Sequence, residues 1–230
     1  MLLLRVCACG YGTWGGPLAC GGLSGRFCMR GSSLLPHNST VIIRKRRLPH
    51  WDVIGQPSFI TFRLHDSLPA HRTFAASSLT SGEAFMAMDR LLDQASSGPK
   101  FLSQPAVAEV VVASVNYGAA IGHYELHSWV VMPNHVHVLL TPQVSLSRLL
   151  GSLKGATAKR ANLLLQRTGQ AFWQDESYDH LVRSGEEFRR IRRYIENNPV
   201  SACLVARPED YVWSSAGRPE RPPQAGGLPH

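Results

Sequence analysis

The sequence predicts an α+β sandwich, in which one antiparallel sheet carries helices packed mainly on one face. Two observations predict this class: helix-like and strand-like segments alternate along the chain, and two strand-like runs adjoin each other near its middle. A hydrophobic content of 44% indicates a folded core rather than a disordered chain. The length of 230 residues is enough for one domain of ordinary size.

We expect this domain to occupy residues 41–216. Residues 1–40 are rich in Gly, Cys and Ser and show no sustained period of 2 or 3.6 residues. They are therefore expected to be a disordered extension, or else the true start of the protein lies downstream, near Met29 or Val41. Residues 217–230 are rich in Pro and Gly and are expected to form a disordered tail.

The expected strands are short segments with a period of two and many β-branched or aromatic residues. They are residues 58–64, 124–131, 135–141 and 178–182. The second and third of these are joined only by Met132, Pro133 and Asn134, which predicts a tight antiparallel pair.

The expected helices have apolar residues at spacings of three and four. They are residues 81–98, 105–117, 146–167 and 186–198. Gly98 is expected to close the first helix, and Pro199 is expected to stop the last one at Asn198, because proline removes a backbone donor.

The charge of the chain favours a polyanionic partner. Lys and Arg number 24 against 16 Asp and Glu, which gives a formal net charge of +8. No apolar run approaches the roughly 20 residues that cross a bilayer, and the apolar stretch that follows Met1 is too short for a signal peptide.

The five cysteines argue for a reduced, cytoplasmic protein. Four lie within the first 28 residues and Cys203 stands alone, so the count is odd and no CxxC…CxxC zinc pattern is present. An extracellular disulfide framework would rarely leave an unpaired thiol.

His135 and His137 are the first candidates for chemistry. Alternate residues of a strand project from the same face, so both imidazoles can reach one divalent cation. One further oxygen ligand would leave coordination positions open for a substrate phosphate. The competing interpretation is two histidines with ordinary hydrogen-bond partners. A histidine-triad nucleotide hydrolase is disfavoured, because Leu139 occupies the next position on that face.

Tyr194 and Asn198 are the second candidates. They lie four residues apart on one flank of the last helix, beside a buried stripe formed by Phe188, Ile191 and Ile195. A tyrosine hydroxyl can attack phosphorus and hold a covalent phosphotyrosine, while the amide oxygen of Asn198 could be a third metal ligand. Alternatively, the tyrosine is an aromatic at the edge of the core and the asparagine merely ends the helix.

Basic residues near these segments are candidates for contacts with a nucleic-acid backbone. They are Arg44, Lys45, Arg46, Arg47, Lys154, Lys159, Arg160, Arg190 and Arg193. The alternative for all of them is a solvated helix face or a basic terminus.

The two candidate segments together resemble a known family. MPNHVHVLL (residues 132–140) and YIENNPV (residues 194–200) are similar to the paired signatures of the single-tyrosine HUH, or IS200-like, transposases, and most of all to the REP-associated tyrosine transposases. RLPHW (47–51), FITFRL (59–64) and PEDYVWSS (208–215) resemble the flanking segments of that branch. The resemblance covers residues 44–216, and the two motifs in this order are far more specific than either alone.

This resemblance implies a ferredoxin-like fold and a Mg or Mn ion held by His135 and His137. It also implies that Tyr194 is the nucleophile on single-stranded DNA next to a hairpin. The third ligand varies between Gln and Asn in the family, which favours Asn198 here. Related enzymes include monomers and swapped dimers, so either a monomer or a homodimer is expected.

The expected function is therefore that of a transposase-like, metal-dependent endonuclease and strand transferase, which nicks single-stranded DNA through a 5′-phosphotyrosine intermediate. Two alternatives remain open. One is a protein derived from a transposase that binds DNA hairpins without cutting, and the other is a metal-dependent phosphohydrolase acting on small nucleotides.

Overall fold

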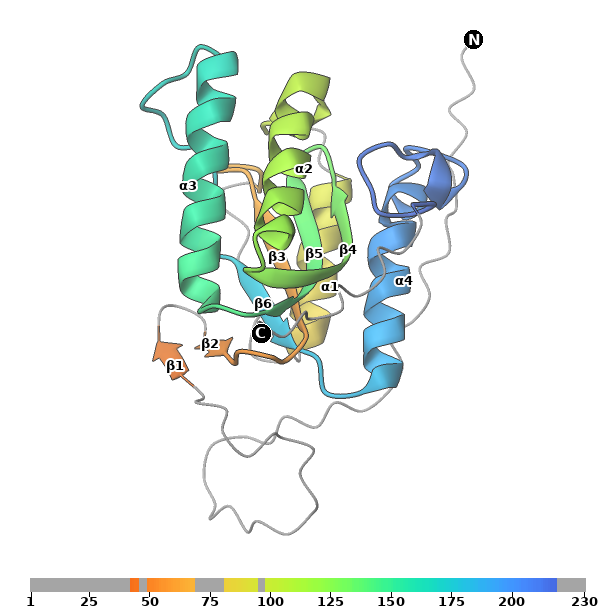
Figure 1. The fold of residues 1–230 in the computed structure, drawn as a ribbon. Coiled ribbons are helices and arrows are strands. Elements are labelled where there is room, and N and C mark those ends of the chain that lie inside the picture. Colours follow the sequence, from red (N-terminus) through yellow and green to blue (C-terminus); the bar gives the residue numbers. More distant parts are fainter. Residues whose placement is uncertain (1–41, 46–48, 69–80, 95–97, 219–230) are drawn as a thin grey trace, which may run out of the picture.

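The computed structural model describes residues 42–45, 49–68, 81–94 and 98–218 (Figure 1). The expected extension at residues 1–40 and most of the expected tail, from residue 219 onward, lie outside these ranges. The elements, in chain order, are β1 (Ile42–Lys45), β2 (Pro49–Asp52), β3 (Ser58–Arg63), α1 (Ser81–Asp93), the 3₁₀ turn η1 (Phe101–Ser103), α2 (Pro105–Ala120), β4 (Tyr124–Val131), β5 (His135–Pro142), α3 (Leu146–Leu164), β6 (Tyr178–Leu181), α4 (Gly185–Ser201) and the 3₁₀ turn η2 (Pro208–Asp210).

Four strands form the main sheet in the order β4-β5-β3-β6, and every neighbouring pair is antiparallel. The elements β3, α2, β4, β5, α3 and β6 follow the β-α-β-β-α-β order of ferredoxin-like folds. The strands β1 and β2 pair separately as a hairpin. The α+β class and the ferredoxin-like architecture are therefore confirmed.

Helices cover both faces of this sheet, and the expectation that they lie mainly on one face is wrong. Ile60 and Phe62 of β3 pack into one buried cluster with residues of α2 and α3, whereas Phe59 packs into a second cluster with residues of α1 and α4 (Figure 1). The reason lies in β5, whose residues are buried along its whole length. A strand whose side chains are buried on both sides needs cover on both sides.

The register of the sheet decides what faces α1 and α4. Thr61 of β3 lies opposite His137 of β5, and Phe59 lies opposite Leu139. Because side chains alternate between the faces, these four residues share one face, and His135 joins them two residues along β5. This face is the floor of the candidate site.

Helix α4 is fixed at its start by side-chain capping. The hydroxyl of Ser184 accepts a hydrogen bond from the backbone N–H of Glu187 (3.1 Å). In return, the carboxylate of Glu187 accepts hydrogen bonds from the Arg183 backbone N–H and from the ring of His180, both at 2.8 Å. This reciprocal arrangement is a form of the capping box.

The other end of α4 differs from expectation, because the helix continues past Pro199 to Ser201. Proline in a last turn costs one intrahelical hydrogen bond, and the remaining turn closes with the N–H of Ala202 bonded to the Asn198 carbonyl (2.9 Å). Ile191 and Ile195 are fully buried against the sheet, which fixes the rotation of the helix and directs Tyr194 and Asn198 to its flank.

Among the helices that the structure describes, none combines the length and the apolar character needed to cross a membrane.

Candidate functional site

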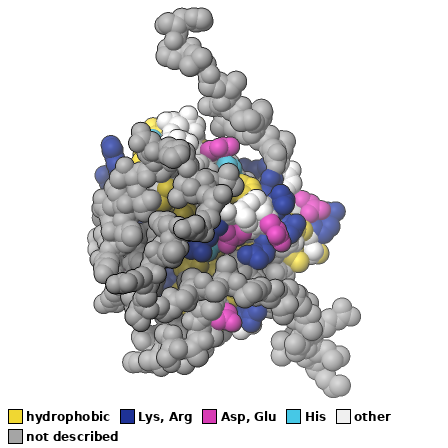
Figure 2. Space-filling view, turned by 90° about the horizontal axis from the view of Figure 1, so that it is seen from below, with side chains coloured by type: hydrophobic (Ala, Val, Ile, Leu, Met, Phe, Trp, Pro, Cys, Tyr) yellow, Lys and Arg dark blue, Asp and Glu magenta, His cyan; other side chains and the backbone are white. Residues whose placement is uncertain are grey.

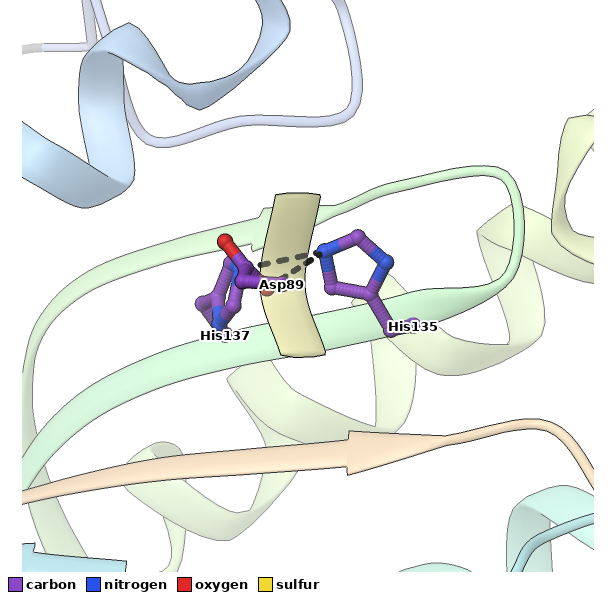
Figure 3. A group of neighbouring side chains, drawn as sticks. All are labelled: Asp89, His135 and His137. Atoms are coloured by element: carbon purple, nitrogen blue, oxygen red, sulfur yellow. Dashed lines mark hydrogen bonds and ion pairs between the residues drawn. The ribbon is translucent and has the colours of Figure 1, made fainter. Parts of the chain in front are cut away.

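Two histidines from β5 and one aspartate from α1 meet between the sheet and the helix (Figure 3). The Nε2 atoms of His135 and His137 are 3.0 Å apart. The Oδ1 atom of Asp89 lies 3.2 Å from His137 Nε2 and 3.5 Å from His135 Nε2. All three residues are buried, and their ligand atoms lie within 4.8 Å of one another, so they form a group that can hold a metal ion.

The protonation of His135 follows from its neighbours. The amide nitrogen of Asn134 donates to the Leu92 carbonyl of α1 (2.9 Å), which leaves its Oδ1 to accept a hydrogen bond from His135 Nδ1 (2.7 Å). Burial, followed by the neighbouring His137, lowers the pKa of His135 to about 3. The ring is therefore neutral, and the lone pair on its Nε2 faces Asp89 and His137.

His137 is oriented by the sheet itself. Its Nδ1 is 2.7 Å from the hydroxyl oxygen of Thr61, its direct neighbour across the strand pair. The other nitrogen, Nε2, is thereby turned towards the cluster, 3.0 Å from the same atom of His135. Two imidazole nitrogens directed at one point, each with its second nitrogen hydrogen-bonded, are typical of histidine ligands to a metal.

Asp89 divides its two carboxylate oxygens between two groups of neighbours. Oδ1 faces the histidines and is buried without a hydrogen-bond partner among the described residues. Oδ2 accepts the hydroxyl of Tyr194 and the amide of Asn198, the latter at 3.3 Å. Burial acts to raise the pKa of Asp89, but the interactions with His137, His135 and Tyr194 outweigh it, so the pKa is lowered and the group is a carboxylate.

Asp93 lies one helical turn beyond Asp89 and carries a second buried oxygen, Oδ1, with no hydrogen-bond partner in the described part of the chain. This atom is 4.0 Å from His135 Nε2. Burial and the charge of Asp89 together raise the pKa of Asp93 to about 8, so its protonated form predominates at neutral pH.

The structure brings the tyrosine and the asparagine of α4 to the same cluster. The ring of Tyr194 lies 5.7 Å from the ring of His137, centroid to centroid. The amide nitrogen of Asn198 is 3.4 Å from His137 Nε2, and its oxygen is buried without a hydrogen-bond partner among the described residues. Rotation of this amide by half a turn would exchange its nitrogen and oxygen, so that the oxygen would face the cluster, as a ligand of the metal ion must.

The basic residues expected to contact DNA lie on several elements. Lys159 and Arg160 are exposed on α3, which packs on the sheet face opposite the cluster. Lys154, also on α3, donates to the carbonyls of Gln174 and Asp175, at 2.5 and 2.9 Å. Its ammonium thus ties the helix to the segment before β6.

The remaining basic residues divide between the N-terminal hairpin and α4. Arg44 and Lys45 belong to β1, while Arg46 and Arg47 lie outside the described residues. On α4, Arg193 is exposed, and Arg190 is half-buried with its guanidinium 3.8 Å from Glu187. Figure 2 shows Lys and Arg side chains mixed with Asp and Glu on the side where α4 lies.

Sequence reasoning missed Asp89, Asp93 and the orienting hydroxyl of Thr61. A signal for the aspartates was present, because Phe85, Asp89 and Leu92 are spaced as the buried stripe of an amphipathic helix. A carboxylate within an apolar stripe must find a partner inside the protein, which marks it as a candidate for function. The pairing of Thr61 with His137 depends on strand register and had no local signal.

The family described as "Transposase IS200 like" matches residues 100–198, a span that includes both histidines, Tyr194 and Asn198 but not Asp89. This stretch of the chain is therefore similar to the IS200-like transposase family.

Two curated relatives match part of this chain. The ISDra2 transposase TnpA of Deinococcus radiodurans is 34% identical over 85 residues, which are 34% of this chain and 61% of that protein. An uncharacterized protein of Haemophilus influenzae is 24% identical over 97 residues, 33% of this chain and 54% of that one. The chain thus spans less than two thirds of the length of either relative.

Two solved structures are also similar to this chain. A REP-associated tyrosine transposase bound to a REP hairpin matches with a TM-score of 0.48 and 18% identity, covering 76% of this chain and 83% of that one. A crystal structure described as a transposase candidate from Deinococcus radiodurans matches with a TM-score of 0.30 and 19% identity, covering 67% and 97%.

Proposed function

We propose that the protein is a metal-dependent endonuclease and strand transferase for single-stranded DNA, which cuts beside hairpins and forms a 5′-phosphotyrosine intermediate. One observation carries the proposal: the hydroxyl of Tyr194 is bonded to the same carboxylate, Asp89, that faces His135 and His137. A nucleophile for phosphorus and a set of metal ligands therefore adjoin each other. The transposase family of residues 100–198 supports DNA as the substrate.

The residues present suit a divalent cation such as Mg or Mn. His135 and His137 offer neutral nitrogen donors, and Asp89 and Asn198 each carry a buried oxygen without a hydrogen-bond partner among the described residues. Nitrogen and oxygen donors of this kind match the preferences of Mn and related ions. A bound ion would polarise a nonbridging oxygen of the scissile phosphate.

In the proposed reaction, the Tyr194 hydroxyl gives up its proton, and its oxygen attacks the scissile phosphorus and forms a phosphate ester. The bond from phosphorus to the 3′-oxygen breaks, and that oxygen leaves as a 3′-hydroxyl after it gains a proton. The DNA then remains joined to the protein through a 5′-phosphotyrosine. Attack by another 3′-hydroxyl reverses the step and transfers the strand, so no external energy source is needed.

The basic side chains are proposed to bind the DNA backbone. Arg193 is the best placed of them, because it is exposed on α4 next to Tyr194 in the chain. We also propose backbone contacts by Arg190, Lys159, Arg160, Lys154 and residues 44–47. The proposal further includes a preference for hairpins, a cytoplasmic location and a monomeric or homodimeric state, which go beyond the geometry of the cluster.

The decisive experiment is covalent trapping. Incubated with Mn and a panel of labelled hairpin-bearing oligonucleotides, the parent protein is expected to retain label on a denaturing gel. Tyr194→Phe should reduce this adduct by at least about 1,000-fold, since the attacking oxygen is gone. Tyr211→Phe is a matched control, because its hydroxyl donates to the Val131 carbonyl (3.0 Å) away from the cluster.

The other outcomes identify the alternatives. Cleavage without any protein-bound label would indicate a phosphohydrolase, and retention of binding without cleavage would indicate a DNA-binding protein that does not cut. An adduct that survives Tyr194→Phe would refute the assignment of the nucleophile.

A further inference from the structure

We propose that Asp89 joins the two halves of the site, with Oδ1 as a ligand of the metal ion and Oδ2 as the group that positions the Tyr194 hydroxyl. This inference rests on the proposed function, and it assigns a role to a residue of α1 that lies outside the span matched by the transposase family.

The Oδ1 atom of Asp89 is buried, has no hydrogen-bond partner among the described residues, and lies 3.2 and 3.5 Å from the Nε2 atoms of His137 and His135. A buried carboxylate oxygen without a donor is costly unless a cation or proton satisfies it. Two imidazoles and one carboxylate with the remaining positions open are a recurrent donor set for divalent metals. The geometry therefore favours Asp89 as a third ligand.

The Oδ2 atom of Asp89 accepts hydrogen bonds from the Tyr194 hydroxyl and, at 3.3 Å, from the amide N–H of Asn198. Because both oxygens belong to one rigid carboxylate, a metal on Oδ1 and the phenol on Oδ2 are held at a fixed separation. Asp89 is therefore a positioning residue for the nucleophile as well as a ligand.

The packing of α1 fixes the position of Asp89. This residue is 2% exposed and lies on a helix held to the sheet by buried Phe85 and Leu92. The Leu92 carbonyl of the same helix also accepts the Asn134 amide, whose oxygen orients His135. Helix α1 thus carries one ligand and fixes another, so that the spacing of the ligand set depends on it.

Asn198 acquires a different role in this arrangement. Its nitrogen, rather than its oxygen, faces Asp89 and His137. It therefore supports the carboxylate by hydrogen bonding, and the third ligand comes from α1 instead of α4. Asn198→Ala should consequently weaken metal binding less than removal of the Asp89 carboxylate does.

The test measures Mn²⁺ binding without DNA, by the loss of the free-ion electron paramagnetic resonance signal. Asp89→Asn, which keeps the size of the side chain, should weaken binding by at least about tenfold. Tyr194→Phe should change it by less than about threefold, because the hydroxyl is bonded to Oδ2 and not to the proposed ligand atom Oδ1. Asp179→Asn is the control, since Asp179 pairs with Ile60 on the other face of the sheet.

A second readout addresses positioning. At saturating Mn²⁺, Asp89→Asn should still slow formation of the covalent adduct by at least about tenfold, which a residue that only bound metal would not do. Asp89→Asn protein that binds Mn²⁺ as the parent does would overturn the ligand role. Adduct formation at the parent rate with saturating metal would overturn the positioning role.

A measurement on the parent protein covers the case in which Asp89→Asn does not fold. With aspartate labelled by ¹³C at the side-chain carboxyl, pulsed spectroscopy of bound Mn²⁺ should show coupling to carbon as well as to imidazole nitrogen. Nitrogen coupling without carbon coupling would refute Asp89 as a ligand. Failure of the proposed function is distinct, because it would appear as absence of adduct in the parent while these binding results stand.

Discussion

At the scale of single residues, the site depends on which ring nitrogen each histidine presents. His135 is constrained through Asn134 and its bond to the Leu92 carbonyl, so that Nδ1 donates. His137 is oriented at its other ring nitrogen, Nδ1, by the Thr61 hydroxyl at 2.7 Å. For Nε2 to bind a cation, Nδ1 must carry the proton and donate it to that hydroxyl oxygen.

Thr61→Val tests this contact with almost no change of side-chain shape. The variant leaves the buried Nδ1–H of His137 without an acceptor, so Mn²⁺ affinity is expected to fall by about 10- to 100-fold while the fold is retained. Isothermal titration calorimetry measures the affinity, and circular dichroism checks the fold. Thr61→Ser restores the hydroxyl and should restore most of the affinity, and equal losses in both variants would contradict the argument.

The residue scale also shows where sequence reasoning ended. The types and spacings of His135 with His137, and of Tyr194 with Asn198, are local in the chain, and the family resemblance joined the two pairs into one predicted site. The structure places the four residues together. Asp89 reaches the same point from a segment 46 residues before His135. Its place in an apolar stripe indicates burial, but nothing local in the sequence indicates that it approaches the histidines. Only the packing of α1 on the sheet reveals it.

At the scale of elements, α4 is held in place by its capping contacts at its start and by the buried side chains of Ile191 and Ile195 further along. Burial acts to raise the pKa of Glu187, but hydrogen bonds from the Arg183 backbone and the His180 ring outweigh it and lower the pKa below its ordinary value. The carboxylate form is therefore favoured in the folded state. Its stabilising effect is present above pH 4.5 and is lost as the pH falls through the lower pKa of the folded state.

Glu187→Gln should accordingly destabilise the protein in a pH-dependent manner. The free energy of unfolding is expected to fall by about 1–2 kcal/mol at pH 7, and the difference from the parent should shrink as the pH falls below 4.5. Urea unfolding at a series of pH values measures this. Glu186→Gln, an exposed neighbour in the same turn, should change stability by no more than about 0.5 kcal/mol. A loss independent of pH would argue against a role for the charge.

Most elements were predictable because their signals are local, but their arrangement was not. The local patterns predicted the four strands of the main sheet and all four long helices, whereas the distribution of helices over the sheet depends on long-range packing. Phe59 and Ile60 are neighbours in β3 that both face a hydrophobic cluster, on opposite sides. Such a run is equally compatible with one covered face or two until the partners are known.

At the scale of the whole molecule, the cluster draws on α1, β5 and α4, which are distant in sequence. A ligand that binds only when these elements are assembled stabilises the folded state by mass action. Metal binding and global stability should therefore be coupled.

The melting temperature gives a direct measure of this coupling. Mn²⁺ at 100 times its dissociation constant contributes about 2.7 kcal/mol, which for a chain of this size raises the melting temperature by about 5–11 °C. His135→Ala with His137→Ala should abolish the shift, and a chelator should reverse it in the parent. A similar shift in the double variant would place the ion elsewhere.

The burial of the cluster has a consequence for the fate of the intermediate. His135 and His137 are fully buried and Asn198 is 2% exposed, so bulk water has little access to the cluster, while Tyr194 beside it is half-buried. In the proposed reaction, the tyrosyl ester would form at the edge of this buried region, where limited access of water would slow its hydrolysis. Slow hydrolysis would leave the ester available to an incoming 3′-hydroxyl, which favours rejoining of DNA over release of broken ends.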